Sequence, residues 1–213
     1  MNAPREAFAD NVIEALQAQA DEFIAIRRDI HKHPEMGYKE YRTSDLVAEQ
    51  LQAWGYAVTR GLGGTGVVGR LQRGSGSKTL GVRADMDALP MDEDTDLDFK
   101  STIAGAMHAC GHDIHMASWL GAATLLAKSR KDWKGTLVFI GQPAEEVGGG
   151  CARVVVPEHG VARLGDARLR EDAAHLLLVH AERAGADAGA DVRHPGQLQQ
   201  ALHDTVFTVR SVQ

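Results

Sequence analysis

The stretch MHACGHDIH (residues 107–115) and the later segment QPAEE (residues 142–146) concentrate the reactive side chains of this chain. A thiol, several imidazoles and two adjacent carboxylates form a ligand set suited to divalent first-row metals. A carboxylate that is not itself a ligand can accept a proton from water polarised by such an ion. Together the two segments predict a metal-centred hydrolase site.

Cys110 and His112 flank a single glycine, Gly111. A turn at this glycine brings both side chains toward one ion, whereas on a regular helix they diverge. We therefore predict that residues 108–115 form a loop. A lone histidine is more often structural than a ligand, but here five candidate ligands fall within eight positions, which favours a site: His108, Cys110, His112, Asp113 and His115.

The pair Glu145 and Glu146 follows an apolar run, residues 135–140, that predicts a central strand. Ligands of α/β sheets bind at the carboxyl ends of such strands. Adjacent side chains on a rigid strand end cannot share one role, so one glutamate is expected to bind metal and the other to accept a proton. The alternative is a solvated acidic turn.

Asp85 and Asp87 lie in RADMDALP (residues 83–90), at the end of another predicted strand. One interpretation makes them acceptors that orient metal-ligating histidines. The other makes them caps of the acidic loop that follows (residues 92–98). The pattern leaves both interpretations open.

Hydrophobic periodicity alternates between helical and strand spacing along the chain, which predicts an α/β fold. The predicted helices cover residues 8–30, 43–54 and 115–128, and the predicted strands cover residues 56–59, 66–71, 79–84, 135–140, 176–179 and 205–210. The glycine-rich residues 61–66 precede a strand and lack the Lys-Ser/Thr of a phosphate-binding loop, so a turn is expected there.

The chain has 213 residues, with 23 Lys+Arg against 29 Asp+Glu and no basic block, so we expect a small-molecule substrate rather than nucleic acid or a membrane. The N-terminal residues form no apolar run, which predicts a cytoplasmic protein. The two cysteines, Cys110 and Cys151, are too few for a disulfide framework, and a redox function for this pair is disfavoured. The absence of a Gly-x-Ser-x-Gly motif disfavours a serine hydrolase.

Four motifs follow one another along the chain: RDIHKHPE (28–35), RADMDALP (83–90), MHACGHD (107–113) and QPAEE (142–146). In these motifs, and in their order and spacing, the chain resembles the zinc-type aminoacylase and hippurate hydrolase family of amidohydrolase metallopeptidases. This family includes plant auxin-conjugate hydrolases. The resemblance is close over residues 8 to 150. It implies a metallo-aminopeptidase-like catalytic domain, with a mixed, mainly parallel sheet flanked by helices.

The resemblance also implies roles for particular residues. Cys110, His112 and Glu146 correspond to metal ligands, Glu145 to the general base, and Asp87 to an aspartate that orients the site. The implied cofactor is a divalent metal, two ions of zinc, manganese, cobalt or nickel. A further histidine ligand follows a strand in the family, and His180 fits this place best, with His175 as competitor.

Family members continue well past 213 residues, and the run at 206–210 resembles the first strand of their inserted dimerisation or lid domain. We therefore expect residues 1–204 to be the N-terminal part of the catalytic domain and residues 205–213 the start of an inserted domain that is otherwise missing. A change of composition after about Cys151 favours a shifted reading frame or a truncated gene.

Two functions follow from these expectations. The first is a metal-dependent amidohydrolase that cleaves the amide bond of N-acyl amino acids, including hippurate-like or peptide substrates. Full-length relatives are often homodimers. The alternative is an inactive, C-terminally truncated remnant that still binds metal.

Overall fold

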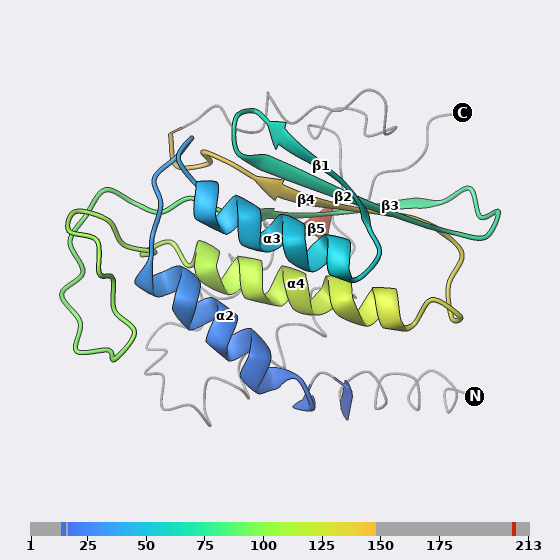
Figure 1. Cartoon of the computed structure of the whole chain (residues 1–213), viewed down its shortest axis with the longest axis horizontal. Coiled ribbons are helices and arrows are strands. Elements are labelled where there is room, and N and C mark those ends of the chain that lie inside the picture. Colours follow the sequence, from blue (N-terminus) through green and yellow to red (C-terminus); the bar gives the residue numbers. More distant parts are fainter. Residues whose placement is uncertain (1–13, 16, 148–205, 208–213) are drawn as a thin grey trace.

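The computed structural model describes residues 14–15, 17–147 and 206–207. Helices α3 (Tyr41–Ala53) and α4 (His112–Lys128) pack on one face of a sheet, and helix α2 (Ala20–Lys32) packs against α4 (Figure 1). The strands are β1 (Ala57–Leu62), β2 (Gly66–Arg73), β3 (Thr79–Asp85), β4 (Gly135–Gln142) and β5 (Val206–Phe207). The predicted α/β fold is confirmed.

The strand order is β1-β2-β4-β3-β5, so β4 lies between two strands that precede it in the chain. Among the five described strands of this sheet only β3 and β4 pair in parallel, while β1–β2, β2–β4 and β3–β5 are antiparallel. The sheet is mixed as predicted, but the prediction that it is mainly parallel is wrong for this part of the chain. The reason lies in the connections: a tight turn forces β1 and β2 to be antiparallel, whereas α4 supplies the crossover that a parallel β3–β4 pair needs.

Strand β4 is buried on both faces, which explains its continuous apolar sequence. Leu137 and Phe139 face the helices and join the main core, while Val138 and Ile140 face the opposite side. Trp119 of α4 packs edge to face on Phe139 at 5.1 Å, and its Nε1 donates a hydrogen bond to the Val82 carbonyl at 3.0 Å. These contacts fix α4 against the central strands that carry the site.

Most predicted elements agree with the structure to within a few residues. Helix 43–54 corresponds to α3, and the strand predictions at 56–59, 66–71, 79–84 and 135–140 correspond to β1 to β4. The expected loop 108–115 is partly wrong, because α4 begins at His112. The N-terminal part of the first predicted helix, the strand at 176–179 and the boundary between residues 204 and 205 lie outside the described residues.

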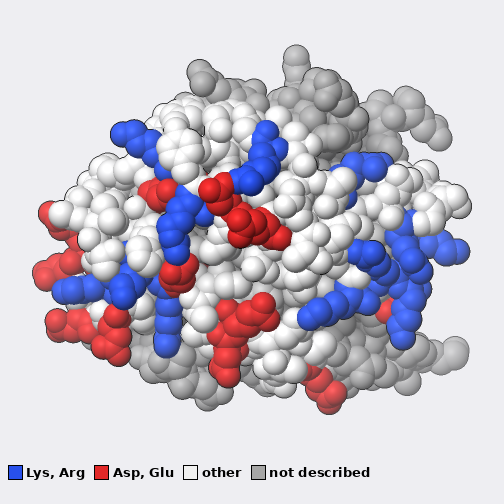
Figure 2. All heavy atoms as spheres, viewed as in Figure 1, with Lys and Arg blue, Asp and Glu red and all other residues white. Residues whose placement is uncertain are grey.

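Basic and acidic side chains intermingle over much of the face seen in Figure 2, and acidic groups gather at the left edge, where the long loop between β3 and α4 lies. Within the described ranges, every helix is too short or too polar to cross a membrane.

Candidate metal centre

The candidate site lies where the carboxyl ends of β3 and β4 meet the start of α4. The parallel register pairs Asp85 with Gln142, the last residues of their strands. Beyond this pair, Met86 N donates to the Gln142 carbonyl at 3.0 Å, so the two segments leave the sheet together. Three stretches that are distant in sequence therefore converge at this edge of the sheet.

Cys110, His112 and Glu146 come together there, with one potential ligand atom from each lying within 4.8 Å of the others. Gly111 has a φ of 89°, a left-handed conformation that suits glycine and turns the chain from the Cys110 loop into α4. The predicted convergence of Cys110 and His112 about Gly111 is thus seen in the structure.

The ring of His112 has a defined orientation. Its Nδ1 lies 2.7 Å from the backbone carbonyl of Asp87, which accepts a hydrogen bond from it. In the neutral ring Nε2 therefore carries the lone pair, which a bound metal ion takes in place of a proton, and Nε2 lies 3.8 Å from Glu146 Oε1 and 3.9 Å from Glu145 Oε2. Burial lowers the pKa of His112, but Asp87 and Asp85 outweigh it and raise the pKa to about 9.

Asp87 connects His112 to the two glutamates. Its side chain is fully buried and accepts hydrogen bonds from Glu145 N at 3.1 Å and Glu146 N at 2.9 Å. Burial alone would raise the pKa of Asp87, but hydrogen bonds from His112 and these two N–H groups hold it below its ordinary value. The contacts support the interpretation that Asp87 orients the site over a role as a cap of the acidic loop.

The adjacent glutamates Glu145 and Glu146 differ in how far their side chains are exposed to solvent. The Glu145 side chain is 41% exposed and that of Glu146 is 18% exposed. Oε1 of Glu146 is buried without a hydrogen-bond partner among the described residues. A buried carboxylate oxygen that makes no hydrogen bond and lies beside the imidazole Nε2 fits a cation ligand, while Glu145 is accessible for proton transfer.

Cys110 faces the same negative charges. Burial, a hydrogen bond with Glu146 and the charges of Glu146, Glu145 and Asp85 raise the pKa of its thiol to about 12. A thiolate forms here only when a cation offsets those carboxylates, and a bound divalent ion does so directly. The sulfur, nitrogen and oxygen donors of this site therefore fit a divalent transition metal.

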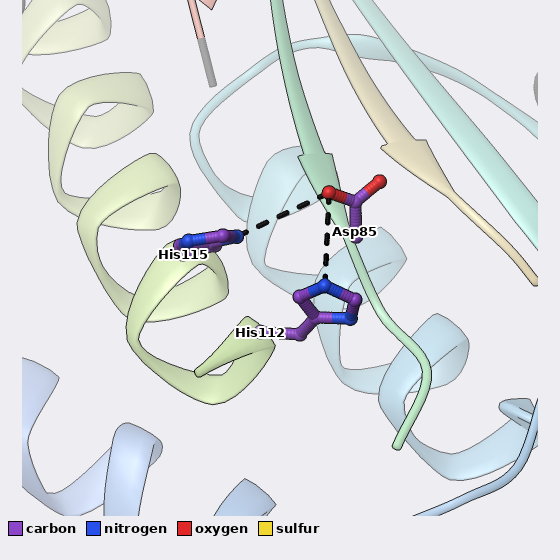
Figure 3. Close-up of side chains that lie close together, drawn as sticks. All are labelled: Asp85, His112 and His115. Carbon is purple, nitrogen blue, oxygen red and sulfur yellow. Dashed lines mark ion pairs between the residues drawn. The ribbon is translucent and has the colours of Figure 1, made fainter. Parts of the chain in front are cut away.

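A second group of possible ligands shares His112. Figure 3 shows His112 and His115, both on α4, directed toward Asp85 at the end of β3. Asp85 Oδ2 lies 4.0 Å from His112 Nε2 and 4.0 Å from His115 Nδ1. The same nitrogen of His112, Nε2, faces both groups. A single ion bound to this nitrogen can therefore lie in one group or in the other.

The Asp85 group differs from the Cys110 group in charge and access. Its members are all buried, and Asp85 already forms an ion pair with Arg83. Burial raises the pKa of Asp85 to about 6, although Arg83 and His112 lower it. Burial, with the charges of His112 and Arg83, lowers the pKa of His115 to about 4.

Asp113 and His108 do not join the metal-ligand groups found among the described residues. Asp113 accepts hydrogen bonds from His31 Nδ1 and Arg27 Nε, both at 2.9 Å, in the interface of α2 and α4. Burial would raise the pKa of Asp113, but His31 and Arg27 lower it to about 2. The sequence interpretation assigned no role to Arg27 and His31, although a spacing of four residues places two side chains on one face of a helix.

Replacing Asp113 with asparagine is expected to lower the free energy of unfolding at neutral pH by about 2–3 kcal/mol, because His31 and Arg27 lose the buried counterion whose pKa they lower to about 2. The lowered pKa means that the stabilisation is present above about pH 4 and is lost as the pH falls toward 2. Urea unfolding at several pH values measures both effects.

Asp29→Asn is the matched control, because Asp29 also pairs with a histidine and an arginine, His33 and Arg42, but at the surface. Its cost is expected to stay below about 1 kcal/mol. Equal losses in the two variants would contradict the role of burial at Asp113.

Residues 81–209, more than half of the chain, match Peptidase family M20/M25/M40. The chain belongs to this family. The predicted family relationship is confirmed, and so is the metallopeptidase-like catalytic fold.

Named relatives of this M20-family chain each match about two thirds of its length. Thermostable carboxypeptidase 1 of Saccharolobus solfataricus is 54% identical over 130 residues, which is 61% of this chain and 33% of the relative. Hippurate hydrolase of Campylobacter jejuni is 46% identical over 145 residues, 68% of this chain and 37% of the relative. This chain thus spans about a third of the length of these relatives.

A solved structure agrees with this relationship. A dinuclear metal-binding peptidase of the M20 family from Bacillus subtilis superposes with a TM-score of 0.62 at 40% identity, over 65% of this chain and 39% of that protein. His180 and its competitor His175 lie outside the described residues, so the fourth predicted ligand stays a prediction.

Proposed function

We propose that this chain carries the N-terminal part of a metal-dependent amidohydrolase that cleaves the amide bond of N-acyl amino acids. The supporting observation is the convergence of Cys110, His112 and Glu146 beside the accessible carboxylate of Glu145. Relatives named hippurate hydrolase and N-acetylcysteine deacetylase, 46% and 41% identical, support the substrate class.

The proposed ligands are Cys110, His112 and Glu146, with His180 as a further ligand. This group is favoured over Asp85, His112 and His115 for two reasons. Asp85 Oδ1 forms an ion pair with Arg83, whereas Glu146 Oε1 makes no hydrogen bond within the described part of the chain and lies 3.8 Å from His112 Nε2. Cys110 is also exposed, and a catalytic metal needs a position open to substrate.

When bound, the metal supplies a Lewis acid that polarises the scissile carbonyl and makes water more acidic. Glu145 then accepts a proton from the attacking water and returns it to the amide nitrogen as that nitrogen leaves with the amino acid. Asp87 keeps His112 in the tautomer that presents Nε2, and it holds the backbone of Glu145 and Glu146 in place.

The proposed cofactor is two ions of zinc, manganese, cobalt or nickel, and the description of the Bacillus subtilis relative as dinuclear supports this number. A cytoplasmic location and activity on peptides stay predictions.

Metal removal tests the proposal. The purified chain is stripped with a chelator, reloaded with Zn²⁺, Mn²⁺ or Co²⁺, and assayed with hippurate and other N-acyl amino acids for released amino acid. Turnover is expected only in the reloaded protein, because the chain's own side chains supply the base but no strong Lewis acid. Metal binding without turnover would favour the alternative of a metal-binding remnant, and failure to bind any of these ions would contradict both.

A further inference from the structure

Glu40 is a fully buried carboxylate at the start of α3, with 0% exposure. It occupies the N-cap position, yet its side chain makes no capping hydrogen bond. The capping is done by Glu35, which accepts hydrogen bonds from Arg42 N at 2.9 Å and Thr43 N at 2.8 Å. The Glu40 carboxylate is therefore available for a different task.

That carboxylate reaches the turn that contains the two site glutamates. Glu40 Oε1 accepts a hydrogen bond from Ala144 N at 2.7 Å, and Oε2 accepts one from the hydroxyl of Thr65. Thr65 is itself buried in the turn between β1 and β2. Desolvation of a carboxylate is costly unless its oxygens are hydrogen-bonded, so these two contacts fix where the Glu40 side chain can lie.

The turn after β4 needs such support. Ala144 has a φ of 53°, a left-handed conformation that is unfavourable for a residue with a Cβ atom. Its N–H is bound by Glu40, and the next two N–H groups are bound by Asp87. Three successive backbone N–H groups thus donate hydrogen bonds to two buried carboxylates, Glu40 and Asp87, which come from different parts of the chain.

The backbone around Glu40 and Thr65 also packs closely against this turn. A Cβ atom at Gly37 would lie 2.9 Å from Val147 Cγ2 and 3.3 Å from Ala144 Cα. One at Gly66 would lie 3.1 Å from Pro143 Cδ. The turn between β1 and β2 and the segment before α3 therefore both pack against the turn after β4. Glu40 supplies the polar contact with that turn.

We propose that Glu40 is a positioning residue that sets the turn carrying Glu145 and Glu146, with Thr65 orienting its carboxylate. The importance of that turn for metal binding rests on the proposed function. Loss of the Glu40–Ala144 hydrogen bond frees Ala144 to leave its left-handed conformation, which moves both glutamates relative to His112. Small displacements of this kind weaken metal sites and slow catalysis.

The test compares Glu40→Gln with Glu35→Gln in the full 213-residue chain. Glutamine keeps the size of the side chain, but its amide has a single acceptor oxygen and no charge, so it loses one of the two accepted hydrogen bonds and weakens the other. We expect about tenfold faster amide exchange over residues 142–147 and about 10–100-fold weaker Co²⁺ binding in Glu40→Gln. Glu35→Gln weakens the cap of α3 in the same way and is expected to lower the Tm without either change.

Co²⁺ binding is followed through the cobalt–thiolate absorption, which requires Cys110 and does not depend on turnover. Exchange over residues 142–147 and Co²⁺ affinity equal to those of the wild type in a folded Glu40→Gln protein would overturn the proposal. If the wild type binds no cobalt, the proposed metal ligands fail, and amide exchange alone decides the role of Glu40.

Thr65→Val provides a second variant, because it leaves the carboxylate in place and removes only the group that orients it. If Glu40→Gln does not fold, Thr65→Val must show faster exchange over residues 142–147 than Glu35→Gln. Equal exchange in these two variants would likewise overturn the proposal.

Discussion

Replacing Glu145 with glutamine is expected to lower kcat of the metal-loaded chain by about 10²–10⁴-fold, which is the contribution typical of a general base. The amide of glutamine has almost the size of the carboxylate but cannot take up a proton at neutral pH. The backbone N–H that Glu145 donates to Asp87 is untouched, so the turn and Glu146 keep their geometry. Steady-state release of amino acid from an N-acyl substrate measures the loss, and elemental analysis measures bound metal.

Glu49→Gln is a suitable control, because Glu49 is an exposed glutamate on α3 and the substitution removes the same charge from the chain. It is expected to leave kcat unchanged. Normal turnover in Glu145→Gln would exclude Glu145 as the base, and a parallel loss of metal would show that Glu145 acts as a ligand instead.

Sequence patterns located the strands of the site but not the order of the sheet. The runs at 66–71, 79–84 and 135–140 correspond to β2, β3 and β4. The insertion of β4 between β2 and β3 is a long-range pairing, and an apolar run buried on both faces has no preference for a particular neighbour. The start of α4 was also missed, because Gly111 precedes it without the side-chain cap that usually marks a helix start in sequence.

Clustering in sequence proved a partial guide to clustering in space. Cys110 and His112 converge because Gly111 adopts a left-handed conformation between them. Asp113 is only one residue further on, but each helical residue turns by about 100°, so its side chain points to α2 and binds Arg27 and His31. Once a helix begins inside a cluster, its members separate onto different faces.

Replacing Cys110 with alanine is expected to weaken Zn²⁺ or Co²⁺ binding more than 100-fold, above the roughly 10–100-fold cost of losing a group that only supports a ligand. Replacing His115 with alanine is expected to change the affinity by less than about threefold, since loss of a side chain that does not touch the ion leaves its ligands in place. Both substitutions remove one possible ligand from a group that contains His112. Isothermal titration of the two variants therefore distinguishes the two candidate positions of the ion.

The reverse result, with a loss in His115→Ala and none in Cys110→Ala, would place the ion between Asp85 and His115. The surrounding charges argue against that outcome. An ion beside Asp85 would lie close to the Arg83 guanidinium that already pairs with this carboxylate, whereas the Cys110 thiol faces Glu145 and Glu146. Since repulsion between like charges is strongest where water is excluded, the fully buried Asp85 group is the less favourable of the two positions for a divalent ion.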